Sequence, residues 1–294
     1  ERADPDRYEQ RFEFCDVLVV GSGPAGLAAA LTAARSGARV ALMEQDSELG
    51  GSLLSSASPE DETWRSAVVA ELNALPNVRI RTRTAVQGLY DGNLAIALER
   101  REHLNPDAAK GQPRQVLVNL TFKSIVMATG AIERPLVFSN NDRPGVMLAS
   151  AVRTYLNRFA VAPNQRAVFV TNNDQAYAAA FDAAEAGIAV TLADLRARPA
   201  GTLVAKAASL GVAVFPGTGI ADVEGGKMLS RVKLSGAHAA SIDCDVLGVS
   251  GGWSPAVHLT SHGGIRPVFE EKIAAFVPGG FAPGHGGAGA MMGT

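Results

Sequence analysis

One pattern occurs twice in this chain, at residues 17–44 and, at a constant offset of 150 without a gap, at residues 167–194. The first copy reads VLVVGSGPAGLAAALTAARSGARVALME and the second reads AVFVTNNDQAYAAAFDAAEAGIAVTLAD. Each copy consists of an apolar run, a turn, an Ala-rich helical stretch, a glycine, a second apolar run and a closing acid. This order predicts a β-turn-α-β unit that is used twice.

The turn of the first copy has the spacing G-x-G-x-x-G. Gly21 permits the tight turn out of the strand, Gly23 leaves room for a pyrophosphate at the backbone, and Gly26 lets the helix pack close to the sheet. The N-terminus of the helix, which includes Pro24 and Ala25, supplies free N–H groups and a positive dipole. Because a strand precedes this turn and a helix follows it, the turn predicts a bound dinucleotide, with a vestigial fold as the alternative.

The second copy has lost these glycines. It has Thr171, Asn173 and Ala176 at the same places. Side chains on the first two would stand where phosphate oxygens need bare backbone. We therefore expect one functional nucleotide site, in the first copy, and a structural role for Asp194, the closing acid of the second copy.

The closing acid of the first copy, Glu44, is expected at the end of the second strand, where it would accept hydrogen bonds from the adenosine ribose. A carboxylate there would repel a 2′-phosphate, so NAD is favoured over NADP. A solvated acid is the alternative for Glu44, and an ion pair with Glu133 is the alternative for Arg134. The other residues expected to contact the cofactor are Gln45, Gly51, Ser52, Val86, Ala128, Thr129, Gly130 and Arg134.

The predicted fold class is α/β, with two dinucleotide-binding domains of the Rossmann-like, glutathione-reductase type, the second inserted in the first. Residues 1–150 and 255–294 are assigned to the first domain, which includes a β-meander at residues 78–126. Residues 151–254 are assigned to the second, degenerate domain.

Smaller elements follow from local patterns. Residues 1–14 are interpreted as an arm before the first strand, and residues 78–86 (VRIRTRTAV) as one run with strand periodicity. The pair Asp91-Gly92 predicts a hairpin turn. Helices are expected near residues 64–75, 148–159 and 201–210.

The composition excludes several classes of partner. The formal net charge of −2 gives no electrostatic reason to expect nucleic acid or an anionic membrane. No apolar stretch reaches the roughly 20 residues that a membrane helix needs. The two cysteines, Cys15 and Cys244, form no CxxC pair, so neither a disulfide framework nor a dithiol redox centre is expected. The chain therefore suits a cytoplasmic location, and its lack of an initiating Met fits a piece of a longer protein.

Catalytic machinery is not evident in the sequence. His258 and His262 lie four residues apart, but no HExxH or other ligand spacing supports a metal site. There is no kinase loop and no P-loop. The sequence nominates a cofactor site but no catalytic residue and no metal ligand.

Two long motifs resemble one known family. They are ATGAIERPLVF at residues 128–138, continuing through NDRPGVMLA at residues 141–149, and SGGWSPAVHL at residues 250–259. Both are similar to the alpha subunit of heterotetrameric sarcosine oxidase, as is the stretch from Thr171 to Tyr177. The similarity extends from about residue 14 to the end of the chain.

The resemblance implies one chain of a multisubunit amine oxidase. Enzymes of this family demethylate sarcosine to glycine, reduce oxygen to peroxide, and in the folate-dependent form transfer the released carbon to tetrahydrofolate. It also implies beta, gamma and delta subunits as partners, FAD on the beta subunit, FMN at the alpha–beta interface, and NAD in the first site of the alpha subunit. The small amine substrate would then be handled by a partner chain. The family's alpha subunit is much longer and continues into a folate-binding domain that is missing here. We therefore expect either a fragment or a short homologue whose remaining parts are separate chains.

The C-terminal residues also bear on the choice between NAD and FAD. Flavoproteins of the two-domain reductase type usually end with a strand that runs into Gly-Asp, and the acid binds the ribityl chain. Here residues 287–293 read GAGAMMG, without an acid, which favours NAD. Two alternatives stay open: a FAD-dependent dehydrogenase or opine oxidase subunit for another secondary amine, and a non-catalytic NAD-binding scaffold.

Overall fold

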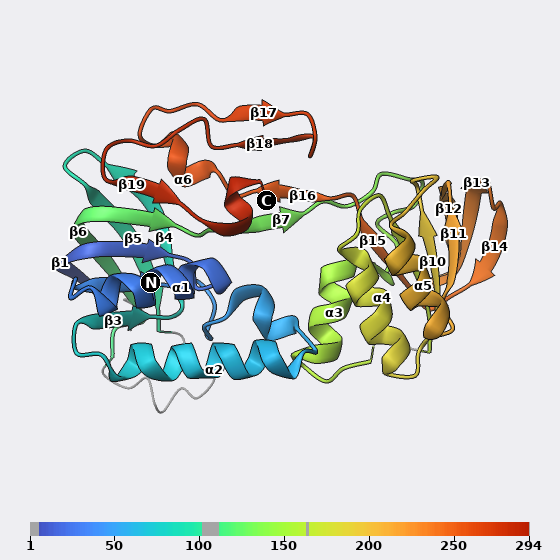
Figure 1. Cartoon of the computed structure of the whole chain (residues 1–294), viewed down its shortest axis with the longest axis horizontal. Helices are drawn as coiled ribbons and strands as arrows, with labels where there is room; N and C mark the ends of the chain where they lie inside the picture. The colour runs from blue at the N-terminus through green and yellow to red at the C-terminus, as the bar shows by residue number, and fades with distance from the viewer. Residues whose placement is uncertain (1–5, 102–111, 163–164, 294) are drawn as a thin grey trace, which may run out of the picture. The chain divides into compact units, whose positions relative to one another are not determined.

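The computed structural model describes residues 6–101, 112–162 and 165–293. The chain forms two compact units (Figure 1). The first unit comprises Glu1–Leu53, Ser58–Ala131 and Ser254–Thr294, and the second comprises Leu54–Ala57 and Ile132–Trp253.

The first unit is built on a mixed sheet in the order β3-β2-β1-β6-β5-β4, with β19 beside β6. Strands β1, β2, β3, β6 and β19 pair in parallel, and β4 and β5 extend the sheet as an antiparallel meander beside β6. Its elements are β1 (Tyr8–Val20), α1 (Pro24–Arg35), β2 (Val40–Met43), α2 (Pro59–Ala74), β3 (Val78–Arg81), β4 (Thr84–Tyr90), β5 (Leu94–Arg100), β6 (Gln115–Met127), α6 (His258–Ser261), β17 (Val268–Glu270), β18 (Ala275–Val277) and β19 (His285–Gly287).

The second unit has a parallel sheet in the order β11-β10-β9-β15-β8 and a three-stranded antiparallel sheet, β12-β13-β14. Its elements are β8 (Val146–Leu148), α3 (Ala149–Asn157), β9 (Arg166–Thr171), α4 (Ala176–Glu185), β10 (Ala189–Asp194), α5 (Gly201–Ser209), β11 (Ala213–Pro216), β12 (Thr218–Gly225), β13 (Leu229–Gly236), β14 (Ala240–Asp243) and β15 (Val246–Ser250). The connecting strands β7 (Ala131–Glu133) and β16 (Trp253–Pro255) pair with each other.

The predicted repeat is confirmed, since β1-α1-β2 and β9-α4-β10 are two β-turn-α-β units. In each β-turn-α-β repeat the two strands pair in parallel, β1 with β2 and β9 with β10. Helices α1 and α4 end at equivalent residues, Arg35 and Glu185, but α4 begins at Ala176, two residues later than the start of α1 predicts. The copies therefore differ at the turn, where the glycines were lost.

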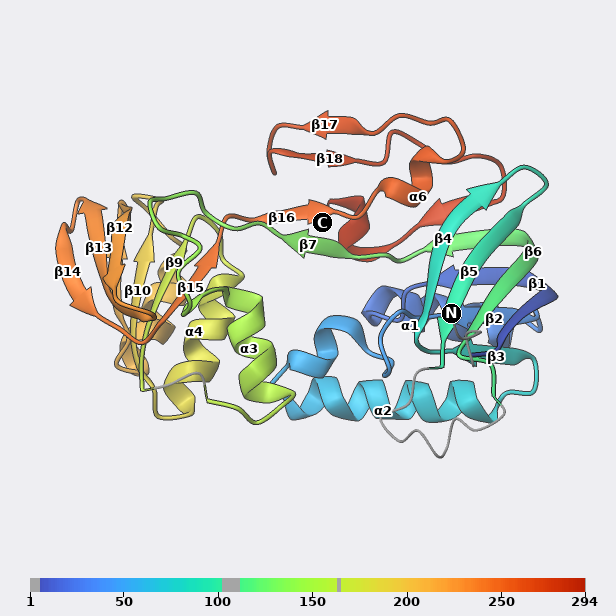
Figure 2. The same ribbon diagram turned by 180° about the vertical axis from the view of Figure 1, so that it is seen from behind.

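Both faces of each parallel sheet are covered, as expected for a doubly covered α/β sheet. In the first unit, Val19 faces α1 and α2, while its neighbours Leu18 and Val20 face the meander. In the second unit, Phe169 packs with the helices, and Val168 packs with β12, β13 and β14. Figure 2 shows the helices, the parallel sheet and the antiparallel sheet of the second unit as three layers.

The observed boundary between the units differs from the predicted one at residue 150. Residues 132–150 cluster with the second unit. The reason is β8, which adds to the second unit's sheet beside β15: Val146 lies opposite Leu247 and Leu148 opposite Val249.

Three local expectations also need correction. Tyr8–Phe14, interpreted as an arm, form the first half of β1 and pair with β6. The run at 78–86 is two strands, because Arg83 has a positive φ of 52° between β3, which pairs with β2, and β4, which pairs with β5. Helix α2 begins at Pro59, before the expected residue 64, because Ser58 caps it by accepting a hydrogen bond from the Asp61 amide at 3.2 Å.

The other local elements agree with the expectations. The hairpin between β4 and β5 turns at residues 91–93, with positive φ at Gly92 and Asn93. Helices α3 and α5 lie at the expected places. Among the described residues, no helix combines the length and the apolar character needed to cross a lipid bilayer.

Candidate functional site

Two glycines of the turn at residues 21–26, called here the fingerprint loop, are required by contacts within the protein. Gly21 has a φ of +95°, and a Cβ added there would lie 2.3 Å from the carbonyl oxygen of Ala128. A Cβ on Gly26 would lie 1.9 Å from the carbonyl oxygen of Gly21. These distances bring the turn against the end of β6 and the helix against the turn, which is the close packing expected of this motif.

Gly23 is different, because nothing in the protein requires it to be a glycine. Its φ of −61° and ψ of −179° are ordinary for any residue, and a Cβ there would meet no atom within 4 Å. The space before its backbone is therefore open. A diphosphate that approaches the backbone would fill this space, as the sequence pattern predicts.

The amino end of α1 faces the loop with unsatisfied donors. The first helical hydrogen bond runs from the Leu27 amide to the Gly23 carbonyl, at 2.9 Å. No side chain caps this helix end, and Pro24 has no N–H. Within the part of the chain that the structure describes, no acceptor lies at the amides of Ala25 and Gly26. These two amides and the helix dipole fit an anionic group.

Glu44 lies directly beside the fingerprint loop and is buried, with 7% of its surface exposed. Its Oε2 accepts hydrogen bonds from the Ser22 amide at 2.8 Å and the Ser22 hydroxyl at 2.7 Å. Its Oε1 accepts one from the Asp46 amide at 2.8 Å. Because an ionised carboxylate accepts about four hydrogen bonds, Glu44 keeps room for roughly one more, which fits one ribose hydroxyl.

The loop after β2 closes against the fingerprint loop. Gly51 has a φ of +54°, and a Cβ there would lie 2.8 Å from the Cα of Gly23. The predicted site residues Gln45 and Ser52 belong to the segment after β2 and are exposed. The structure thus brings the loop after β2 directly to the fingerprint loop.

The end of β6 provides the opposite side of the site. The Ala128 amide donates to the Val20 carbonyl at 2.8 Å, so β6 and β1 end together. Thr129 is held by a hydrogen bond from its hydroxyl to the Ala256 carbonyl at 2.8 Å, and the Ala256 amide donates to the Gly130 carbonyl. These three residues at 128–130 lie at the carboxyl edge of the sheet, where α/β folds bind ligands.

The remaining two predicted site residues are Val86 and Arg134. Val86 is half-buried in β4 and packs against the core of the meander. Strand β4 reaches the site through Thr84, whose amide donates to the Glu44 carbonyl at 2.7 Å. Arg134 belongs to the second unit, where its amide donates to the Gly252 carbonyl at 2.8 Å.

Ser22 was missed by the sequence analysis, because the G-x-G-x-x-G pattern leaves its second position free. The only signal is a hydroxyl residue between two glycines. Its side chain is fully buried and bonds both to Glu44 and to the Gly50 amide, the latter at 3.3 Å.

The C-terminal strand ends beside the same helix terminus. The Ala288 amide donates to the Met127 carbonyl at 3.0 Å, and a Cβ on Gly289 would lie 2.8 Å from the Cβ of Ala25. The sequence contains no Asp or Glu after Glu271. The segment after β19 therefore has no carboxylate for a ribityl chain.

In the equivalent turn of the second unit, side chains of the turn itself accept hydrogen bonds from its backbone amides. The hydroxyl of Thr171 accepts from the Asn173 amide, and the side-chain oxygen of Asn173 accepts from the Gln175 amide, both at 3.0 Å. The Asn173 side-chain amide in turn donates to the Ser250 hydroxyl at 3.0 Å. The Asn173 and Gln175 amides, which correspond to those of Gly23 and Ala25, are thus satisfied internally.

The acid of the second copy is also satisfied within the protein. Asp194 is fully buried and accepts hydrogen bonds from the Tyr177 hydroxyl at 2.9 Å and from the Arg196 guanidinium at 2.7 and 3.0 Å. Arg196 also pairs with Asp174 at 2.7 Å. Burial and the neighbouring Asp194 raise the pKa of the Tyr177 hydroxyl above its ordinary value.

The Tyr177→Phe variant is expected to lose about 1–3 kcal/mol of stability, because buried Asp194 loses a hydrogen-bond donor. Nucleotide binding should not change, since Tyr177 belongs to the second unit. Urea unfolding and a nucleotide titration would check both expectations. Tyr155→Phe, at an exposed tyrosine, is the matched control and should be near neutral. A Tyr177→Phe variant as stable as the parent would contradict the structural role of the Asp194 network.

Three of the histidines that the structure describes make packing or backbone contacts, whereas His103 lies outside the described residues. His262 accepts a hydrogen bond on Nδ1 from the Leu89 amide at 3.1 Å. His285 lies edge-on to Phe122, and burial lowers its pKa. His238 stacks on Phe215. Within the described residues, no group of His, Cys, Asp and Glu side chains is placed to hold a metal ion.

Both cysteines are buried thiols. Burial raises the pKa of Cys15 and of Cys244 from 9.0 to about 12. Below pH 9 both thiols stay protonated in the folded and the unfolded chain. Above pH 9 only the unfolded chain ionises, so their contribution to stability falls as the pH rises from 9 to 12.

A thiol reagent at pH 8 is therefore expected to label the folded chain very slowly, and to label both cysteines once denaturant is added. Absorbance of the released chromophore would follow the reaction. Fast labelling of the native chain would contradict this protection and would reopen thiol chemistry as a possible function.

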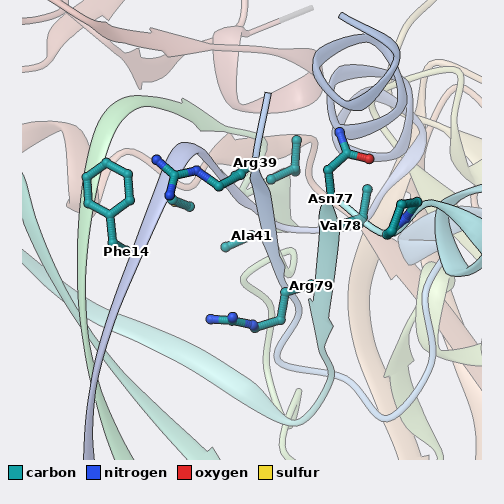
Figure 3. Close-up of a pocket in the computed structure, with 9 residues that line it drawn as sticks. Phe14, Arg39, Ala41, Asn77, Val78 and Arg79 are labelled. Atoms are coloured by element: carbon teal, nitrogen blue, oxygen red, sulfur yellow. The ribbon is translucent and has the colours of Figure 1, made fainter. Parts of the chain in front are cut away.

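A cavity of about 170 Å³ lies at the other end of the same sheet (Figure 3). It is lined where β2 and β3 begin, by residues such as Val40 and Val78, rather than where they end. The cationic side chains there are already paired, Arg39 with Asp16 and Arg79 with Glu13. This cavity is therefore separate from the nucleotide site and offers no free cation for an anion.

Comparisons with known proteins agree with this fold. The family model described as pyridine nucleotide-disulphide oxidoreductase matches residues 15–273. The thioredoxin reductase of T. acidophilum has a similar structure, with a TM-score of 0.73 at 17% identity, and the match covers 95% of this chain and 91% of that one. At this identity the likeness supports the fold alone.

Curated relatives also match the sequence. The sarcosine oxidase alpha subunit of Rhizobium meliloti (strain 1021) is 41% identical over 300 residues, which cover 99% of this chain and 30% of that protein. An opine oxidase subunit of Agrobacterium tumefaciens (strain Ach5) is 33% identical over 185 residues, which cover 60% of this chain and 36% of that protein. This chain thus spans about a third of the length of these relatives. It belongs to the pyridine nucleotide-disulphide oxidoreductase family and is homologous, over nearly its whole length, to part of the alpha subunit of sarcosine oxidase.

Proposed function

We propose that this chain is the dinucleotide-binding part of the alpha subunit of a sarcosine-oxidase-like multisubunit amine oxidase, with NAD in the first unit. The main evidence for a bound nucleotide is the glycine at position 23. Neither backbone strain nor packing explains a glycine there, whereas a bound pyrophosphate does. The identity of 41% to a sarcosine oxidase alpha subunit supports the kind of complex.

The first-unit residues fit an ADP moiety. Gly23, Ala25 and Gly26 would hold the pyrophosphate through open backbone and free amides. Glu44 would accept one ribose hydroxyl, and its charge would exclude a 2′-phosphate. A bound pyridine nucleotide supplies hydride-transfer chemistry in general, although by resemblance to the family NAD has no established redox role here.

NAD is preferred to FAD because of the C-terminal segment. After β19 the chain offers Ala288 and Gly289 at the amino end of α1, where a flavin would need an acceptor for its ribityl chain. A flavin there would lose that hydrogen bond, whereas NAD has no ribityl group to satisfy.

Amine oxidation would then take place on partner chains. The sequence nominates no catalytic residue in this chain, and the two thiols are buried. The beta, gamma and delta subunits, FAD on the beta subunit, and FMN at an interface belong to this proposal through the resemblance. So do sarcosine as the substrate and folate as the carbon acceptor.

A second candidate is one chain of a FAD-dependent dehydrogenase or opine oxidase. The 33% identity to an opine oxidase subunit favours it, although that match covers 60% of this chain. A third reading is a scaffold in which the nucleotide only stabilises the fold. The lack of a nominated catalytic residue is compatible with this reading as well.

The deciding experiment is an absorption spectrum of the purified chain, with mass analysis of the small molecules that denaturation releases. A colourless protein that releases NAD is the expected result. Absorbance near ~450 nm with released FAD would overturn NAD in favour of the second candidate, since flavin absorption requires the isoalloxazine ring. If the chain is only a scaffold, a complex reconstituted from the partner subunits and a nucleotide-free variant of this chain should oxidise the amine at the full rate.

A further inference from the structure

Ser22 connects the three segments that make up the nucleotide site. Its hydroxyl donates to Glu44 Oε2 at 2.7 Å and accepts from the Gly50 amide at 3.3 Å, while its own amide donates to the same Oε2 at 2.8 Å. The side chain is fully buried and stands between Gly21 and Gly23. One residue therefore ties the fingerprint loop to the ribose acid and to the loop that approaches Gly23.

These bonds limit how Glu44 can act. Two donors from Ser22 occupy Oε2, and the Asp46 amide occupies one position on Oε1. Of the about four positions that a carboxylate offers, one remains, on Oε1. Glu44 can therefore accept a hydrogen bond from one ribose hydroxyl, but not from two hydroxyls, one on each oxygen.

The hydroxyl of Ser22 also fixes the orientation of the carboxylate. The last torsion of a Glu side chain is broad, so the carboxylate plane is set by its hydrogen bonds. The Ser22 and Asp46 amides hold one oxygen each, and the Ser22 hydroxyl adds a second, short bond to Oε2. Without the hydroxyl, Oε2 would keep one donor, and the carboxylate plane would be held less firmly, by the two amides alone.

We infer that Ser22 is the positioning residue for ribose recognition: its hydroxyl orients Glu44 so that one acceptor position on Oε1 remains for one ribose hydroxyl. The inference rests on the proposed nucleotide site of the first unit. It does not depend on whether the nucleotide is NAD or FAD, because both contain the ADP moiety.

The test measures binding of ADP and of 2′,3′-dideoxy-ADP to the full chain and to the Ser22→Ala variant by calorimetry. For ADP, Ser22→Ala should weaken binding about tenfold, the effect of one misplaced hydrogen bond to a charged group. For the dideoxy analogue, which has no ribose hydroxyl to bind, the same variant should change affinity by less than about twofold. Ser250→Ala, which removes another fully buried serine hydroxyl in the second unit, is the matched control and should leave both affinities unchanged.

The comparison between the two ligands separates positioning from folding, because a partly unfolded variant would lose both ligands equally. Equal losses for ADP and its dideoxy analogue would overturn the inference and leave Ser22 a structural residue. If the wild-type chain binds neither ligand, the nucleotide site itself fails, and the proposed function fails with it. Should the alanine variant not fold, Ser22→Cys keeps the volume with a much weaker donor and should show the same ligand dependence.

Discussion

The Gly23→Ala variant is expected to fold normally and to bind NAD about a hundredfold more weakly, which corresponds to ~3 kcal/mol. A Cβ at this position meets no protein atom within 4 Å, and the backbone angles suit alanine. Because glycine is more flexible than alanine in the unfolded chain, the nucleotide-free variant should even gain up to about 1 kcal/mol. The methyl group would instead occupy the space where a pyrophosphate meets the amides of the helix N-terminus.

Calorimetry with NAD and thermal unfolding of the nucleotide-free chain would measure the two effects separately. Gly201→Ala is the matched control, because a Cβ at the start of α5 also meets nothing within 4 Å. It should leave NAD affinity unchanged. If Gly23→Ala kept the parent affinity, the open space at Gly23 would not be a pyrophosphate site, and the central observation for the proposed function would be lost.

The Gly26→Ala variant should behave in the opposite way and lose stability, by about 3 kcal/mol or more. Its Cβ would lie 1.9 Å from the Gly21 carbonyl oxygen, a backbone atom that no rotamer change can move away. Helix α1 would have to shift away from β1, where Leu27 and Ala30 are fully buried. NAD binding should fall together with stability, because the helix that carries the free amides moves.

Urea unfolding of the nucleotide-free chain measures this loss. The second unit offers the matched control, since Ala176 already occupies the position equivalent to Gly26 and α4 begins there. Ala176→Gly removes one buried methyl and lowers helix propensity, so it should cost only about 1–2 kcal/mol. A Gly26→Ala variant with the unfolding midpoint of the parent would show that the turn can relax around a methyl group.

The sequence predicted best what is encoded locally. Each β-turn-α-β unit was recognisable because its strands, helix and turn lie within about 30 residues and have distinct periodicities. The roles of Gly21 and Gly26 followed from the same local geometry, since the turn and the helix it packs against are neighbours in the chain. The loss of the second fingerprint could also be read directly, because a side chain replaces a hydrogen at a known position.

Which strands pair with each other was harder to predict from the sequence. The first half of β1 is a charged and aromatic stretch whose partner, β6, lies more than a hundred residues away, with Tyr8 opposite Gln115. Likewise, β3 has the same alternating pattern as β4, and only its pairing with β2 assigns it to the parallel part of the sheet. Periodicity reports that a strand has an exposed and a covered face, but it does not report which strand lies beside it.

What the sequence by itself determined was therefore the pair of dinucleotide-binding folds and which of the two keeps the glycine fingerprint, because both depend on short-range spacing of glycines and acids. The tertiary structure alone decided how each acid is used. Glu44 and Asp194 close equivalent units, yet one keeps a free acceptor beside open backbone, while the other is enclosed by Tyr177 and Arg196. It also decided that Arg134 belongs to the second unit and that the Ser22 hydroxyl donates a hydrogen bond to Glu44. Hydrogen-bond partners depend on positions in space that residue spacing does not specify.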